Sequence, residues 1–194
     1  MTNKEKLLDN IKEEVKNCTN CSLYKMRTNT VFSDGCAEAS IFFIGEAPGK
    51  NEDETGLPFV GRAGKLLRSY LDECGYKKED FYIANTIKCR PPENRKPKPF
   101  EKEACRHFLE KQLELVNPKI IVLVGSTALA SYCDDKKLTI TKARGKIFQK
   151  DGKKFFPIFH PSYLLRYHSI SKGSPRYLFK QDLLNILKEA AVSN

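Results

Sequence analysis

Four short apolar runs constrain the fold of this chain more than any other feature. They are SIFFIGE (40–46), FYIANTIKC (81–89), KIIVLVG (119–125) and KKFFPIF (153–159). Near-continuous apolar residues over such lengths are typical of strands that are buried on both faces of a parallel sheet. The sequence therefore predicts four parallel strands at the centre of the molecule.

Helices are expected between and around these strands. Apolar residues at helical spacing, with Pro99 as a helix start and Gly75 as a helix end, predict helices at about 4–16, 63–75, 99–116, from Ser126 or Thr127 onward, and 176–190. Strands that alternate with helices predict a three-layer α/β/α sandwich around a short four-stranded parallel sheet. The length of 194 residues is that of one domain.

Polar residues stand at the C-terminal end of each predicted strand. They are Glu46, Asn85, Ser126 and His160, and an acidic loop with the aromatic Phe59 follows the first of them. Each has an ordinary explanation, such as a turn cap for Asn85 or a hydrogen-bonded structural histidine for His160. Together they predict a pocket for a polar ligand, because ligands of open parallel sheets bind at this edge.

The cysteines predict a metal site. The chain has seven, an odd number that argues against a complete set of disulfides. Cys18 and Cys21 form a C-x2-C pair, and Cys89 and Cys105 lie in loops or at the ends of elements. Four thiolates suit either an iron–sulfur cluster or a tetrahedral zinc ion, and the spacing leaves both open. Cys74 and Cys133 are interpreted as small packing residues.

Net charge indicates the kind of partner, and the apolar segments indicate the compartment. The formal net charge of +10 suits a polyanion, although charge alone does not separate DNA from RNA. No apolar stretch approaches the roughly 20 residues of a membrane span, and the charged N-terminus lacks the apolar segment of a signal peptide. A cytoplasmic protein without membrane contact is therefore expected.

Four motifs resemble those of the family 4 uracil-DNA glycosylases. They are GEAPGKNED (45–53), GLPFVGRAGKLL (56–67), NTIKCRPPENRKP (85–97) and HPSYLLR (160–166), and the four cysteines have matching spacing. The resemblance implies the α/β/α glycosylase fold and a [4Fe–4S] cluster with Cys18, Cys21, Cys89 and Cys105 as ligands. It also implies hydrolysis of the N-glycosidic bond of uracil in DNA, with release of free uracil and an abasic site.

The same resemblance implies roles for the pocket residues. Phe59 would stack on a flipped uracil, Asn85 would bind its edge, His160 would face its O2 atom, and Glu52 would lie near C5. Ala47 stands where better-known glycosylases of the superfamily carry an aspartate that orients the attacking water. Glu46 is then the nearest carboxylate that could position this water.

Contacts with DNA are expected on both sides of this pocket. Leu164 would occupy the place of an apolar wedge that enters the duplex, and the expected DNA-binding side chains are Arg62, Arg90, Arg95, Lys96, Lys98, Ser162 and Arg166. The partner would be uracil-containing DNA, single- or double-stranded, bound by a monomer. The alternatives are a non-catalytic, metal-stabilised nucleic-acid-binding protein and a glycosylase for another deaminated base.

Overall fold

The central sheet carries the strands that the apolar runs predict. The computed structural model describes residues 2–133, 135 and 137–192, and within them six strands pair in the order β1-β3-β2-β4-β6-β5. The four central strands are parallel: β3 (Phe81–Asn85), β2 (Ile41–Gly45), β4 (Ile120–Val124) and β6 (Lys153–Ile158). The prediction of a four-stranded parallel sheet is confirmed for this central part.

Two short antiparallel strands extend the sheet at its edges. They are β1 (Asp34–Gly35), which pairs with β3, and β5 (Phe148–Lys150), which pairs with β6. The expectation of four strands was therefore wrong in number. Strands of two and three residues with few apolar side chains leave no periodic signal, so pairing with a neighbouring strand is what defines them.

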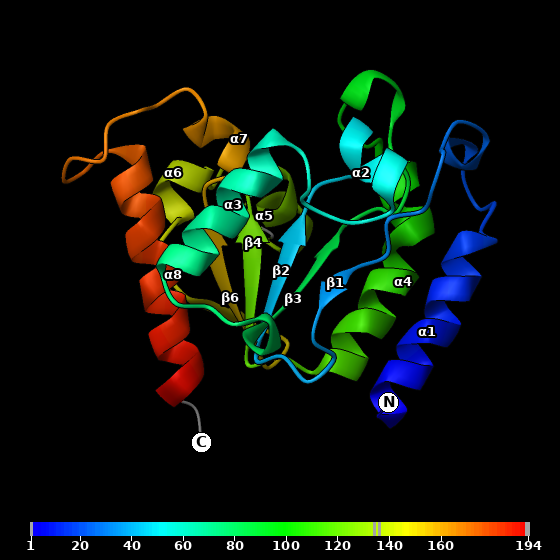
Figure 1. Ribbon diagram of the computed structural model, residues 1–194, viewed down its shortest axis with the longest axis horizontal. Helices are drawn as coiled ribbons and strands as arrows, with labels where there is room; N and C mark the ends of the chain where they lie inside the picture. The colour runs from blue at the N-terminus through cyan, green and yellow to red at the C-terminus, as the bar shows by residue number, and fades with distance from the viewer. Residues whose placement is uncertain (1, 134, 136, 193–194) are drawn as a thin grey trace.

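Helices cover both faces of the sheet, as the α/β/α prediction requires (Figure 1). The long helices are α1 (Asn3–Lys16), α3 (Arg62–Glu73), α4 (Pro99–Val116) and α8 (Pro175–Val192), and α5 (Ser126–Tyr132) follows β4. Short helices that the sequence analysis did not predict are α2 (Lys50–Thr55), α6 (Ile140–Ala143) and α7 (Pro161–Leu164), with single 3-10 turns at Ser22–Lys25, Lys78–Asp80 and Pro92–Asn94.

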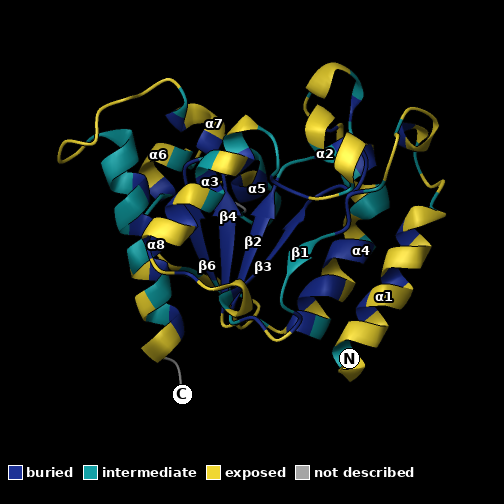
Figure 2. Ribbon diagram, viewed as in Figure 1, coloured by how far each residue is buried: buried dark blue, intermediate teal, exposed yellow. Residues whose placement is uncertain are grey.

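Alternating side chains of the strands supply two separate cores. In β2, Ile41 and Phe43 belong to the core with α3 and α8, whereas Phe42 and Ile44 belong to the core with α1, α4 and α5. The strands are buried along their whole length except at the start of β6 and in the edge strands (Figure 2). This two-sided burial explains why the strands read as continuous apolar runs.

Two local predictions need correction. The apolar run at 81–89 continues beyond its strand, because β3 ends at Asn85 and 86–89 form a buried loop. The N-cap of α5 is Gly125, with a φ of +90°, rather than Ser126 or Thr127. A Cβ atom on Gly125 would lie 2.8 Å from the Cβ of His160, so glycine permits the close approach of these two strand ends.

The described helices give no sign of a transmembrane segment. None of them combines the length and the apolar character that crossing a bilayer requires.

Candidate active site

The C-terminal ends of the parallel strands carry two neighbouring cavities. One, of about 460 Å³, is lined by Ala47, Glu52, Phe59, Arg62, Asn85 and His160, among others. The other, of about 420 Å³, is lined by Glu46, Lys96, Ser126, Thr127, Phe159 and Tyr163, among others. Ala47, His160 and Ser162 line both, so His160 stands between them. We call them the first and the second cavity.

Two residues of the first cavity pack against Gly45, where no side chain stands in their way. Gly45 ends β2 and is in register with Asn85 at the end of β3. A Cβ atom on Gly45 would lie 2.3 Å from Oδ1 of Asn85 and 2.6 Å from the ring of Phe59. The amide and the aromatic ring therefore meet above Gly45, and the absence of a side chain there lets both of them approach.

Phe59 has a strained backbone that its neighbours hold in place. Its φ is +55°, in the left-handed region that bulky residues rarely adopt. Arg68 on α3 donates from Nε to the carbonyl of Phe59 (3.0 Å) and from Nη2 to the carbonyl of Pro58 (2.9 Å), and it forms an ion pair with Asp34 (2.7 Å). Strained backbone conformations that neighbouring residues hold in place occur most often at functional sites.

Glu52 braces the same loop from its other side. Its carboxylate accepts hydrogen bonds from the backbone N–H groups of Gly49 (3.1 Å), Val60 (2.9 Å) and Gly61 (2.7 Å). The acid thus holds together the two ends of the loop that carries Phe59. The expectation that Glu52 lies near C5 of a uracil stays a prediction, while its contacts give it a structural task that sequence analysis missed.

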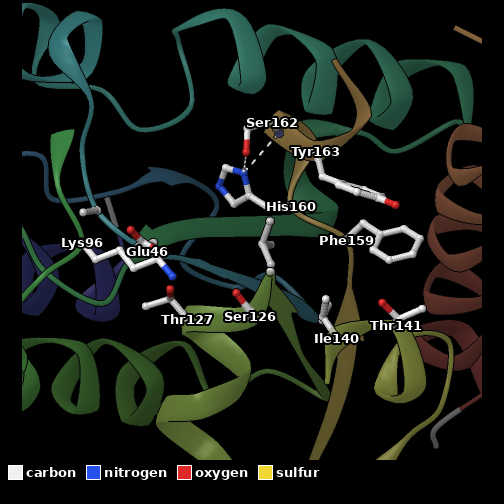
Figure 3. A pocket seen from close by; sticks show the side chains of 13 residues that line it. Glu46, Lys96, Ser126, Thr127, Ile140, Thr141, Phe159, His160, Ser162 and Tyr163 are labelled. Carbon is white, nitrogen blue, oxygen red and sulfur yellow. Dashed lines mark hydrogen bonds between the residues drawn. The ribbon is translucent and has the colours of Figure 1, made fainter. Parts of the chain in front are cut away.

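His160 is oriented by the start of α7. It is the N-cap residue, and its Nδ1 accepts a hydrogen bond from the backbone N–H of Ser162 (3.2 Å) and lies 2.7 Å from Oγ of the same residue (Figure 3). Because Nδ1 is the acceptor, the neutral ring carries its proton on Nε2. Burial lowers the pKa of His160, and the nearby Glu46 carboxylate partly opposes this shift. The ring is therefore a neutral N–H donor at neutral pH.

Lys88 lies between Asn85 and the cysteines, because it also lines the small cavity that Cys18, Cys21, Cys89 and Cys105 share. Its side chain is 1% exposed, and Nζ donates to the carbonyl of Asn85 (3.0 Å) and to Oε1 of Gln112 (2.5 Å). A hydrogen bond from a charged donor to the Asn85 carbonyl fixes the backbone that carries the amide. The sequence analysis missed Lys88, although a lysine inside an apolar run was a signal available in the sequence.

Cys18, Cys21, Cys89 and Cys105 line one small cavity between α4 and the loop after α1. Arg27 donates from Nη1 to Sγ of Cys89 (3.2 Å), yet burial raises the pKa of the Cys89 thiol, and it raises that of Cys105 to about 11. Buried thiols need a cation to become thiolates. The chemistry of four sulfur donors around one cavity fits a thiolate-bound metal group. In the described part of the chain, the side chains of His, Cys, Asp and Glu do not form a group of three or more that is arranged to hold a metal ion.

The residues expected to contact DNA lie in different settings. Lys96 lines the second cavity, Arg62 the first, and Ser162 both, while Arg166 is exposed. Arg95 forms two hydrogen bonds with the buried carboxylate of Glu101 (2.8 and 2.6 Å).

Two further basic residues of the same loop have contacts within the protein. Arg90 donates to Oδ1 of Asn94 (2.7 Å), and Nζ of Lys98 lies 5.9 Å from the centre of the Phe100 ring. Of the four basic residues of this loop, Arg90, Arg95 and Lys98 thus have contacts within the protein, and Lys96 is the one that lines either cavity.

The structure contradicts the expected wedge. Leu164 is 0% exposed and belongs to the core with α3 and α8, so it does not present a side chain to DNA. The helix α7 begins at Pro161 and turns the face of Leu164 inward. Its neighbour Tyr163 is 37% exposed and lines the second cavity instead.

Comparison with known proteins agrees with this geometry. Residues 32–188 match the model of the uracil DNA glycosylase superfamily. A type-4 uracil-DNA glycosylase of Thermotoga maritima is 52% identical over 170 residues, which are 87% of this chain and 88% of that protein. Type-4 enzymes of Archaeoglobus fulgidus (44%, covering 81% of this chain and 83% of that protein) and Sulfurisphaera tokodaii (43%, 81% and 76%) are also similar. The chain therefore belongs to the uracil-DNA glycosylase superfamily.

Proposed function

We propose that this chain is a uracil-DNA glycosylase that hydrolyses the N-glycosidic bond of uracil in DNA, releases the free base and leaves an abasic site. One observation carries the proposal. The ring of Phe59 and the amide of Asn85 meet above Gly45, in a cavity that His160 also lines. An aromatic face, an amide and a neutral N–H donor are the groups that a flipped pyrimidine requires.

Recognition of the base falls to Phe59 and Asn85. The glycosidic bond is inaccessible inside a duplex, so the nucleotide has to leave the stack and enter the cavity. Phe59 then stacks on the ring, and the Asn85 amide binds N3–H and O4 with its acceptor and donor. Cytosine presents the opposite polarity at both atoms and would leave buried groups unpaired, a mismatch that can discriminate by ~10^4 or more. Ala47 and Glu52 complete the wall.

Bond cleavage relies on stabilising the departing base. As the bond breaks, negative charge develops on uracil, and His160 donates from Nε2 to O2. Such a preset donor is typically worth about 3 kcal/mol in the transition state. Glu46 lies close enough to His160 for its charge to oppose part of the lowering of the His160 pKa by burial, and in our proposal its carboxylate positions the attacking water. We expect Glu46, Asn85 and His160 to be the catalytic residues.

Cys18, Cys21, Cys89 and Cys105 would hold a [4Fe–4S] cluster, a proposal that their shared cavity and the motif resemblance support. When bound, the cluster would brace the loop between Cys89 and Cys105. That loop presents Arg90, Lys96 and Lys98, which together with Arg62, Ser162 and Arg166 would contact the DNA backbone. Arg95 would support this surface through Glu101. A monomer in the cytoplasm remains the prediction for assembly and location.

The decisive experiment uses a labelled oligonucleotide with one uracil. The purified protein is incubated with it, and alkali then breaks the strand at any abasic site. Matched oligonucleotides with cytosine or thymine at the same position test selectivity, and Asn85→Ala is the control. A break only at uracil, lost in Asn85→Ala, supports the proposal.

No break at uracil by protein with its iron intact would refute the proposal. Oligonucleotides with other deaminated bases then separate a different glycosylase from a binding protein. A binding protein would retain DNA in a gel-shift experiment and break none of the strands.

A further inference from the structure

Apart from Glu46 and Lys96, the second cavity has no task in the proposed reaction beyond the wall it shares with the first. Its volume of about 420 Å³ is close to the 460 Å³ of the first cavity and within the range of small-molecule sites. The two cavities are separated by His160, which stands at the centre of the view in Figure 3. A ligand in the second cavity would therefore lie directly beside a base bound in the first.

One side of the second cavity is aromatic. The rings of Phe159 and Tyr163 have centroids 5.1 Å apart, and those of Tyr163 and Tyr167 are 4.8 Å apart, both within the range of aromatic pairs. Phe159 is buried, whereas Tyr163 and Tyr167 are 37% and 38% exposed. The three rings form a series that leads from the cavity to the surface.

The remaining walls carry hydroxyl groups, one base (Lys96) and one acid (Glu46), beside the apolar Val124 and Ile140. Ser126, Thr127 and Thr141 line the cavity with hydroxyl groups, and Lys96 lies across from the rings of Phe159 and Tyr163 (Figure 3). Arg166 is exposed between the two tyrosines in the sequence. Aromatic faces beside hydroxyl and cationic groups suit a nucleotide, whose base stacks and whose phosphate is an anion.

We propose that the second cavity is a subsite for an unpaired nucleotide next to the uracil, with its base stacked on Tyr163 and the aromatic series. This inference rests on the proposed uracil-DNA glycosylase function. In a duplex the neighbouring bases are paired and stacked on one another, so their faces are not free for a tyrosine ring. The subsite therefore favours single-stranded DNA around the uracil.

The test compares Tyr163→Leu with Tyr163→Phe, which keeps the ring. On a single-stranded uracil oligonucleotide, Tyr163→Leu should raise KM about 10-fold, since stacking on an aromatic side chain contributes that order of affinity per base. Its single-turnover rate at saturating DNA, and its KM for the matched duplex, should be unchanged. Tyr163→Phe should behave as the wild type.

A second readout reports stacking directly. The fluorescent base 2-aminopurine is placed beside a 2′-fluorinated deoxyuridine, whose fluorine slows cleavage. Its fluorescence should be quenched on binding to the wild type and to Tyr163→Phe, and less so with Tyr163→Leu. If Tyr163→Leu does not fold, Tyr167→Leu at the exposed end of the series carries the same comparison.

Three results would overturn the subsite: an unchanged KM for single strands, an equal loss for single strands and duplex, or a loss in rate alone. Failure of the wild type to cleave uracil would instead refute the proposed function. Cleavage by the wild type thus tests the proposed function, and the comparison of the Tyr163 variants tests the subsite.

Discussion

Replacing Arg68 by methionine tests whether the strained conformation of Phe59 is held for catalysis. The change keeps most of the apolar stem and removes the two donors to Phe59 and Pro58 and the ion pair with Asp34. We expect Phe59 to relax toward an ordinary φ and to leave its position above Gly45. The ring would then no longer be placed to stack on a base.

The structure indicates different sizes for the losses of stability and of rate. Hydrogen bonds from a charged donor contribute about 1.5–3 kcal/mol each, and the 30% exposure of the Arg68 side chain puts these two at the low end, roughly 3 kcal/mol together. Relief of the backbone strain returns about 1–3 kcal/mol. The net loss is then about 1 kcal/mol, or roughly 2–4 °C in Tm for a chain of this size. Misplacement of a positioning group can cost ~10^2 in rate.

Single-turnover cleavage of a uracil oligonucleotide and thermal unfolding measure the two quantities. Asp34→Asn is the matched control, because it weakens the ion pair and leaves both carbonyls with their donors. It should keep a rate near that of the wild type. If Arg68→Met cleaves as fast as the wild type, or if Asp34→Asn loses as much rate, Arg68 does not act by holding Phe59.

Three further predictions concern the base and the cysteines. His160→Ala should lower the single-turnover rate ~10^2-fold or more without a matching loss of DNA binding. Because burial lowers the pKa of His160, half of the wild-type rate should be lost only below the ordinary histidine pKa of about 6.5, and a half-point above pH 7 would contradict this. Asn85→Asp should raise cleavage at cytosine relative to uracil in matched oligonucleotides, and an unchanged ratio would remove its reading role. Cys89→Ala should lose iron and visible absorbance, whereas Cys74→Ala should keep both; equal iron in the two variants would exclude Cys89 as a ligand.

The sequence alone determined the central architecture and the edge at which the site lies. Apolar runs and helical periodicity are local properties that can be recognised in the sequence. A strand that is buried on both faces has a continuous apolar run. They therefore located β2, β3, β4 and β6 and the long helices, and the residues that follow each strand pointed to Glu46, Asn85 and His160. The motifs then indicated the family.

Only the tertiary structure decided how the site is held together. Arg68 acts through Pro58, Phe59 and Asp34, and no local pattern distinguishes it from other basic residues. Lys88 stands out as a lysine within an apolar run, but its partners Asn85 and Gln112 are defined only by the folded structure. Leu164 was expected at the surface, but the inward face of α7 places it in the core, and Tyr163 lines the second cavity in its place. The partner of a side chain depends on contacts between separate elements, and these exist only once the chain has folded.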